Sequence, residues 1–373
     1  MKKFNLKTGV LLLVSLFLLV SCGKDNELIN QSGQDNQLTE KKAIINPVKT
    51  TFATGFSFPR GLEFGPDGYL YVALAGMGGA DRSTCENVIA PVGPYFGGNT
   101  GSIIKISPEG VVTTVASGLP SQVNALGFTS GVADIAFIGS QLYALVSAGC
   151  SHGNGDFPSS VVKVNSDGTW TVVADISAYL KSNPVAAPEK EDFEPDGSLY
   201  SMVNVRGDLY VIEPNHGEMM KVTTSGEITR VIDFSAYFGH IVPTTVTYEG
   251  NFYVGNLRTF PLVEGSSSIY KVTPSGQPKV WATGFTGILG LVFDQQHRMY
   301  VLETSQEPPA NSPAPIVPGT GRVVLVNSNG TKQVIVDGLN FPTGMTFGPD
   351  GALYISDSGF GDPTTGQIIK VKF

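Results

Sequence analysis

Gly61-Leu62-Glu63-Phe64-Gly65-Pro66-Asp67-Gly68-Tyr69-Leu70-Tyr71 is the stretch of this 373-residue chain that decides its fold. An apolar strand leads into a Pro-Asp-Gly turn, and a second strand begins at Leu70-Tyr71. The pairing of an apolar residue with tyrosine returns at Leu142-Tyr143, Leu209-Tyr210, Phe252-Tyr253, Met299-Tyr300 and Leu353-Tyr354. Regular repeats are typical of proteins that use one structural unit many times. The chain therefore contains six copies of one unit.

A second pattern, an apolar-Lys-apolar triplet, follows the tyrosines and predicts a third strand in each unit. It occurs at Ile104-Lys105-Ile106, Val162-Lys163-Val164, Met220-Lys221-Val222, Tyr270-Lys271-Val272 and Ile369-Lys370-Val371, with Val324-Leu325-Val326 as the variant. A glycine turn and a fourth strand follow in every unit but the last. Four strands in each of six units predict an all-β, six-bladed β-propeller.

The last unit lacks a fourth strand of its own, because only Lys372 and Phe373 follow its third strand. Residues 49–56, ahead of the first unit, resemble residues 280–285, which form a fourth strand elsewhere. We predict that the N-terminal strand closes the last blade. This closure joins the two chain ends through backbone hydrogen bonds and covers an edge strand that could otherwise aggregate.

The two ends of the predicted strands have different loops. Five residues always separate the centre of the third strand from the next turn glycine, as from Lys105 to Gly110. The spacing from the second strand to the third runs from 11 residues (Tyr210 to Lys221) to 34 (Tyr71 to Lys105). In a four-stranded meander, these variable loops share one face with the connections between blades. We call it the loop face, and the other the tight-turn face; binding sites usually lie on variable loops.

The first 21 residues are predicted to be a signal peptide, because Lys2 and Lys3 precede an apolar run that ends at Cys22. Small Ser21 before Cys22 resembles the lipobox of bacterial lipoproteins, so Cys22 would carry the acyl chains. The alternative is a buried cysteine that happens to end the leader.

The polar segment 22–46 has no aromatic residue and is predicted to be a disordered tether. The propeller then spans residues 47–373. We expect an exported, monomeric lipoprotein held at a membrane of the bacterial cell envelope, on its periplasmic or cell-surface side.

The charge of the chain argues against nucleic acid as a partner. The sequence has 24 Lys and Arg against 32 Asp and Glu, a net charge of -8. Removing the three lysines of the leader (24 - 3 = 21, against 32) leaves -11. A nucleic-acid-binding protein needs a basic surface instead.

Two cysteines remain besides Cys22. Cys85 and Cys150 lie in loop-face loops of neighbouring blades. In an oxidising compartment we expect them to form a disulfide, with two free buried thiols as the alternative.

Five segments of the chain resemble the ScyD/ScyE family, and the resemblance covers nearly the whole mature chain. They are residues 58–68, 149–153, 192–197, 213–218 and 239–244. That family is similar to NHL-repeat and gluconolactonase-like propellers. The resemblance implies a β-propeller and does not by itself specify a reaction.

Three histidines fall on the loop face: His152, His216 and His240. Three imidazoles with one open position can hold a catalytic zinc ion. The resemblance to NHL-type lyases, which use histidine-bound zinc at this end of the channel, agrees with such a site. The alternative is that these histidines bond to loop backbone. His297 falls in a turn on the other face.

A second set of polar residues ends the second strands near the channel mouth, and calcium favours such oxygen ligands. Gluconolactonase-like propellers hold a divalent ion with Glu, Asn and Asp at this place, and the corresponding residues here are Glu213, Asn256, Glu303 and Asp357. The alternative is that they cap strand ends by accepting hydrogen bonds from loop amides.

Two function hypotheses follow. The first is a propeller that binds a small molecule, glycan or protein partner through the loop face. Arg60 and Arg258 on that face could bind a carboxylate, or they could merely pair with the acidic residues there. The second is a metal-dependent hydrolase or lyase with Glu213 or Glu194 as general base. The sequence contains no Gly-x-Ser-x-Gly, His-Glu-x-x-His or phosphate-binding glycine motif. This argues against the enzyme classes that those motifs mark.

Overall fold

The computed structural model describes residues 47–373 apart from 84–87, 89–91, 313 and 328. The signal peptide, the lipidated Cys22 and the tether predicted for residues 1–46 lie outside the described residues, as does Cys85. In the part of the chain that is described, no helix is long and apolar enough to cross a bilayer.

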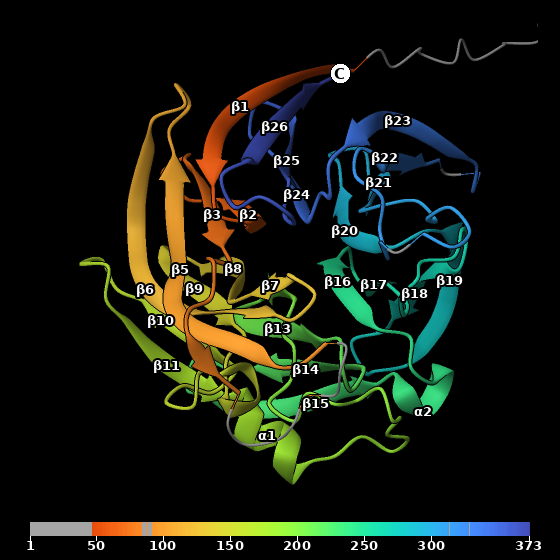
Figure 1. Ribbon diagram of the computed structural model, residues 1–373. Coiled ribbons are helices and arrows are strands. Elements are labelled where there is room, and N and C mark those ends of the chain that lie inside the picture. The colour runs from red at the N-terminus through yellow and green to blue at the C-terminus, as the bar shows by residue number, and fades with distance from the viewer. Residues whose placement is uncertain (1–46, 84–87, 89–91, 313, 328) are drawn as a thin grey trace, which may run out of the picture. The chain divides into compact units, whose positions relative to one another are not determined.

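The described residues form six antiparallel sheets around a common axis, which are the blades of a propeller (Figure 1). From the inner to the outer strand, blade 1 contains β2 (Pro59–Phe64), β3 (Leu70–Leu74), β5 (Tyr95–Ile106) and β6 (Val112–Asn124). Blade 2 contains β8 (Val132–Ile138), β9 (Gln141–Val146), β10 (Ser160–Val164) and β11 (Trp170–Asp175). Blade 3 contains β12 (Ser201–Val205), β13 (Asp208–Glu213), β14 (Glu218–Val222) and β15 (Ile228–Asp233).

The second half of the ring repeats this order. Blade 4 contains β16 (Pro243–Tyr248), β17 (Phe252–Asn256), β18 (Ser267–Val272) and β19 (Pro278–Phe285). Blade 5 contains β20 (Ile288–Phe293), β21 (Met299–Glu303), β22 (Gly321–Val326) and β23 (Lys332–Leu339). Blade 6 contains β24 (Gly344–Phe347), β25 (Leu353–Asp357), β26 (Gly366–Lys372) and β1 (Val48–Phe56). The predicted six-bladed fold is confirmed.

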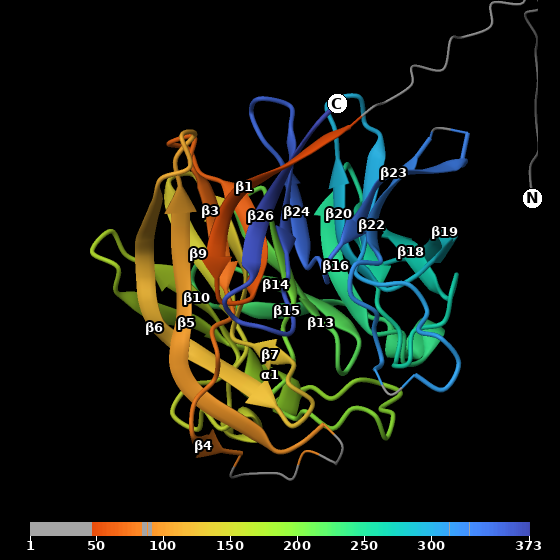
Figure 2. The same ribbon diagram turned by 45° about the horizontal axis from the view of Figure 1, so that its top comes forward.

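Several short strands and helices lie on the loop face. The strand β4 (Asp81–Arg82) pairs with β5, and β7 (Thr129–Ser130) pairs with the end of β6. The helices are η1 (Cys150–His152), α1 (Ile176–Ser182) and α2 (Ser235–Phe238). Figure 2 shows β5 and β6 running on past the rest of blade 1 as a long ribbon toward this face.

The N-terminal strand closes the ring, as the sequence predicted. β1 pairs antiparallel with β26, from Val48 opposite Lys372 to Phe56 opposite Gly366. The inner strands contact one another in succession, and β24 contacts β2. Blade 6 therefore contains both ends of the propeller chain, and no gap separates it from blade 1.

The repeated tyrosines and lysines of the sequence face each other across the second and third strands. Tyr71 pairs with Lys105 and Tyr354 with Lys370, and each ammonium lies within 6 Å of the tyrosine ring. The same tyrosines pack edge-on against the inner strand of the next blade, Tyr71 against Phe137 at 5.0 Å and Tyr354 against Phe64 at 5.1 Å. The tyrosine of the repeated motif thus forms a contact between successive blades.

The constant five-residue spacing also has a structural cause. Each outer strand has a bulge, and in blade 2 the extra residue is Val173. A Cβ added to Gly226, in the tight turn of the next blade, would lie 2.2 Å from the Val173 carbonyl oxygen. A Cβ added to Gly168 would lie 2.9 Å from the Val115 carbonyl oxygen, and one added to Gly276 would lie 2.2 Å from the Val231 carbonyl oxygen. In blades 2, 3 and 4 the turn glycine therefore allows the tight turn to lie against the bulge of the blade before it, whereas a Cβ at Gly330 of blade 5 would have nothing within 4 Å.

We predict that Gly226→Ala destabilises the propeller more than Gly207→Ala does. Both glycines have φ near +90°, at +89° and +93°, but the Cβ at Gly207 would have nothing within 4 Å. The left-handed conformation costs each variant about 1–2 kcal/mol. The clash with Val173 adds about 1–3 kcal/mol to Gly226→Ala alone. Urea unfolding of both variants measures the difference, and equal losses would show that the blade contact contributes nothing.

Candidate functional site

A cavity of about 500 Å³ opens at the loop-face end of the central channel. Its wall includes residues at the start of all six inner strands, which are Arg60, Ala133, Tyr200, Thr244, Leu289 and Thr343. Sites for small molecules commonly measure about 300–1,000 Å³. We call this space the loop-face cavity.

Four phenylalanines from loops of different blades meet at the loop-face cavity, and we call them the aromatic cluster: Phe128, Phe260, Phe341 and Phe360. Phe128 stacks on Phe360 at 4.5 Å and on Phe260 at 5.6 Å between ring centroids. Phe341 meets Phe360 edge-on at 5.3 Å. Although it belongs to this cluster, Phe260 keeps 42% of its surface exposed. The cavity therefore has an aromatic wall that solvent can reach.

The hairpin between β6 and β7 brings Phe128 to the cavity. Asn124 Oδ1 accepts hydrogen bonds from the amides of Leu126 (3.0 Å) and Phe128 (2.9 Å), and Gly127 takes a φ of +85°. The Arg60 guanidinium donates to the Thr129 carbonyl oxygen and so ties β7 to the inner strand of blade 1. Local turn chemistry and one arginine thus fix this part of the wall.

Two arginines face the cavity from opposite blades, Arg60 in blade 1 and Arg258 in blade 4. Arg258 donates from Nε to the Ser266 carbonyl oxygen at 3.2 Å. Among the described residues, neither arginine forms an ion pair with a carboxylate. Both side chains line the loop-face cavity, and their predicted role in binding a carboxylate stays a prediction.

The backbone around the cavity is strained. Val242, Arg258 and Phe341 all line it, and their φ values are +55°, +73° and +48°. Branched and bulky residues rarely adopt this conformation, and such strain is concentrated at ligand sites. The surrounding structure therefore holds this wall in one shape.

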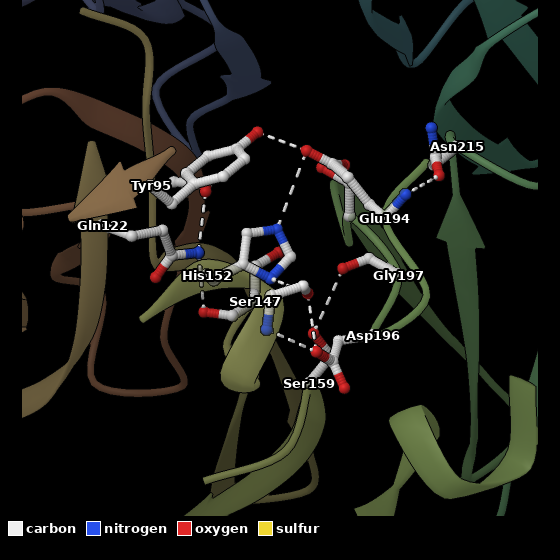
Figure 3. Close-up of polar contacts among 12 residues, drawn as sticks. Tyr95, Gln122, Ser147, His152, Ser159, Glu194, Asp196, Gly197 and Asn215 are labelled. Atoms are coloured by element: carbon white, nitrogen blue, oxygen red, sulfur yellow. Dashed lines mark hydrogen bonds and ion pairs between the residues drawn. The ribbon is translucent and has the colours of Figure 1, made fainter. Parts of the chain in front are cut away.

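A buried polar network lies beside the cavity, and Figure 3 shows its centre. The Tyr95 hydroxyl donates to Glu194 Oε1, and His152 Nε2 lies 3.7 Å from the same oxygen. His152 Nδ1 lies 2.8 Å from the Ala148 carbonyl oxygen, and the Tyr95 ring meets the imidazole edge-on at 4.7 Å. Tyr95 and Glu194 line the cavity, whereas His152 is fully buried behind them.

The network holds an ion pair. Burial lowers the pKa of His152, but the Glu194 carboxylate outweighs this effect and the pKa is raised. Burial raises the pKa of Glu194, but His152 and then Tyr95 outweigh it and the pKa is lowered. Burial and the Glu194 charge raise the pKa of Tyr95 well above its ordinary value, so the phenol remains a donor. The two opposite pKa shifts favour an ionised Glu194 beside a protonated His152.

A second carboxylate fixes the loop that bears Glu194. Asp196 Oδ2 accepts from the Ser151 amide (2.9 Å) and hydroxyl (2.6 Å), and Lys181 Nζ lies 2.7 Å from Asp196 Oδ1. Asn215 Oδ1 accepts from the Glu194 amide at 2.9 Å. Blades 2 and 3 together hold Glu194 in place (Figure 3).

The three histidines predicted as zinc ligands take separate partners. His152 pairs with Glu194, His216 Nδ1 with Glu213 at 3.1 Å, and His240 Nδ1 with Asp192 at 2.9 Å. The described residues contain no group of three or more His, Cys, Asp or Glu side chains that could hold a metal ion. These residues do not fit a zinc site, and we derive no step through zinc.

The four residues predicted as calcium ligands accept hydrogen bonds from loop amides at the strand ends. Glu213 Oε1 accepts from the amides of Ser198 and Asn215, and Asp357 Oδ1 accepts from the Asn340 amide. In the same way Asn256 accepts from the Ser268 amide and Glu303 from the Thr286 amide. Their side chains do not line the loop-face cavity. These hydrogen bonds are the ones that the alternative, capping of strand ends, predicts. The structure does not bring the four side chains together as a calcium site.

The two residues predicted as general base, Glu194 and Glu213, differ in their position relative to the cavity. Glu194 lines the cavity, and Glu213 does not. Cys150 is disulfide-bonded. Its predicted partner Cys85 lies outside the described residues, so that pairing stays a prediction.

Sequence reasoning missed the aromatic cluster and Tyr95. One signal was available: Gly127-Phe128, Phe260-Pro261 and Gly359-Phe360 each place a phenylalanine beside a turn residue in a loop-face loop. Large apolar side chains in such loops indicate a binding surface.

No family model and no curated protein matches the chain. Solved structures do. A Bacteroides thetaiotaomicron protein of unknown function is 14% identical with a TM-score of 0.55, over 87% of this chain and 76% of that one. A gluconolactonase from Xanthomonas campestris is 11% identical with a TM-score of 0.53, over 87% of this chain and 88% of that one.

The fold is that of the gluconolactonase-like β-propellers. At such low identity this likeness concerns the fold alone. The function of this propeller has to be argued from its own residues.

We predict that His216 stabilises the propeller below neutral pH. Burial lowers its pKa, but the charge and hydrogen bond of Glu213 outweigh burial and raise the pKa from 6.5 to about 9. A raised pKa gives stability that is complete below pH 6.5 and is lost as the pH rises through about 9. The stability difference between the unmodified protein and His216→Asn should shrink by up to about 3 kcal/mol over that range.

Urea unfolding at pH 6, 7.5 and 9.5 measures this difference. His297→Asn is the matched control, because His297 pairs with Glu249 at 2.8 Å but its side chain is 72% exposed. Solvent screens such a pair, so its curve should follow that of the unmodified protein. A His216→Asn curve parallel to the unmodified one would contradict the predicted coupling to Glu213.

Proposed function

We propose that this gluconolactonase-like propeller binds a small organic molecule in the loop-face cavity. The observation that carries the proposal is the aromatic cluster, in which Phe260 remains 42% exposed beside a cavity of about 500 Å³. Burying aromatic side chains is favourable, so an exposed ring at a cavity is a place where a ligand gains contact. The strained wall at Val242, Arg258 and Phe341 supports the same conclusion.

A small molecule suits this site better than a glycan or a protein. The wall combines phenylalanine and leucine side chains with few polar groups that converge on the same space, among them Arg60, Arg258 and His240. Pockets with this composition bury most of the surface of a small ligand. A protein partner would instead use a flatter surface.

We also propose that acyl chains on Cys22 hold the protein at a membrane of the cell envelope. The signal-peptide pattern and the lipobox-like Ser21-Cys22 support this. The described chain begins on the tight-turn face, because Val48 pairs with Lys372, whereas Phe56 reaches the loop face opposite Gly366. The five segments that resemble the ScyD/ScyE family support membership of that family, which we propose as the narrower one: residues 58–68, 149–153, 192–197, 213–218 and 239–244.

Hydrolysis or lyase chemistry without the predicted metal sites is the second candidate function. Glu194 favours it, because an ionised carboxylate at the cavity wall, with Tyr95 as a donor beside it, can act as a general base. This candidate predicts turnover in a panel of lactones and esters. Glu194→Gln would then slow the reaction about 100-fold or more, and Glu191→Gln, at the same wall, would not.

We predict that Phe260→Ala weakens the binding of small molecules about tenfold, because it removes the exposed ring of the aromatic cluster. A fragment library screened by saturation-transfer NMR identifies the ligands, and titration gives their affinities. Trp281→Ala is the matched control, since Trp281 is 37% exposed and packs edge-on against Tyr253 outside the cavity. No ligand in the screen, or equal losses in both variants, would overturn the proposed function.

A further inference from the structure

We propose that the ligand of the loop-face cavity is an organic acid with one carboxylate on an aromatic or otherwise apolar body. This inference rests on the proposed function and specifies its ligand class. It follows from the charges at the cavity wall, the fixed position of one arginine and the apolar character of the remaining wall.

The cavity wall contains two guanidinium groups that lack carboxylate partners. Arg60 uses one terminal nitrogen on Thr129, and Arg258 uses Nε on Ser266. Arg60 also interacts with the Tyr200 hydroxyl, which is a neutral partner. A partly buried guanidinium with only neutral partners gains most from an anion, because charge-assisted hydrogen bonds are the strong ones.

The carboxylates at the same wall do not cancel this charge. The charge of Glu194 is compensated by His152, which is fully buried behind it. Glu191 lies 3.6 Å from Lys190 Nζ, and both side chains are exposed, at 40% and 89%, so solvent screens its charge. What remains at the wall is the positive charge of Arg60 and Arg258.

This positive site belongs to an acidic protein. The whole sequence has 32 Asp and Glu against 24 Lys and Arg. In such a chain, cations without partners are not expected by composition, because carboxylates are in excess. An anionic ligand gives these two arginines a role.

The backbone holds Arg258 in a position suited to a carboxylate. Its φ of +73° is unusual for a residue with a side chain, and the bond from Nε to Ser266 fixes the plane of the guanidinium. The two terminal nitrogens remain as a fork. Such a fork matches the two oxygens of a carboxylate.

The rest of the ligand has to be apolar. The aromatic cluster and Leu126, Leu257 and Ile316 form much of the remaining wall. The stack of Phe260, Phe128 and Phe360 offers a flat face at its exposed end. An aryl acid places its carboxylate on Arg258 and its ring against this face.

Matched pairs of ligands test the inference. Indole-3-acetate, 3-phenylpropionate and 1-naphthylacetate are titrated into the purified protein by isothermal calorimetry, each against its neutral amide. We expect each acid to bind about tenfold or more tightly than its amide, and the preference to weaken with added salt. In Arg258→Gln the preference should fall to about twofold or less while the amide still binds, which shows that the variant is folded.

Arg206→Gln is the control, because Arg206 also has a positive φ, of +57°, but lies in an exposed turn of the tight-turn face. It should retain the full preference for acids. Arg258→Lys should retain part of it, since lysine keeps the charge and loses the fork.

Equal binding of acids and amides would overturn the inference and leave the proposed function intact. The same holds if fragments bind in the cavity but no acid or amide of the panel does. An acid preference that survives in both Arg258→Gln and Arg60→Gln would also overturn it, because the charge would then act elsewhere. Failure of every fragment and every acid to bind would instead defeat the proposed function itself.

Discussion

The backbone ladder between β1 and β26 places the first and last strands of the propeller in one sheet, and the remaining architecture depends on that closure. Without it, blade 6 would end on an unpaired edge and the inner strands would not form a closed ring. Because the ring is closed, loops from six blades point at one axis. The loop-face cavity exists only because all six inner strands begin around the same space (Figure 1).

Closure also explains why the two faces differ. On the tight-turn face the turn glycines of blades 2, 3 and 4 lie against the bulge of the blade before them, as Gly226 does against Val173. On the loop face no such contact fixes the length of the loops, so they can differ between blades. In blade 1 the hairpin between β6 and β7 extends across this face, and its Phe128 stacks on Phe260 and Phe360. The rigid face supports the fold, and the variable face forms the site.

Most of the fold could be predicted from the sequence because its determinants are local and repeated. The Tyr–Lys pair exemplified by Tyr71 and Lys105 marks two adjacent strands in every copy but the fifth, where Tyr300 pairs with Leu325, and repetition made the count of blades secure. Closure by β1 was predictable because the last copy lacked a strand.

The site was less predictable, because its contacts join residues that are distant in sequence. The position of each histidine in a loop did not reveal that His152 would be buried against Glu194, 42 residues later in the chain (194 - 152), rather than open to a metal ion. Glu213 and Asp357 looked like metal ligands, but loop amides donate hydrogen bonds to their carboxylate oxygens. Arg60 and Arg258 were expected on the loop face, and both line the loop-face cavity there, whereas their role in binding a carboxylate stays a prediction.

The central claim is that the loop-face cavity, with its aromatic wall and its two arginines, is the ligand site of this propeller. A crystal structure of the protein with bound 1-naphthylacetate tests it most directly. The account predicts the ring of the ligand against Phe260 and its carboxylate within hydrogen-bond distance of Arg258. Ligand density at the tight-turn face beside Trp281 and His297, with the loop-face cavity holding only water, would contradict it.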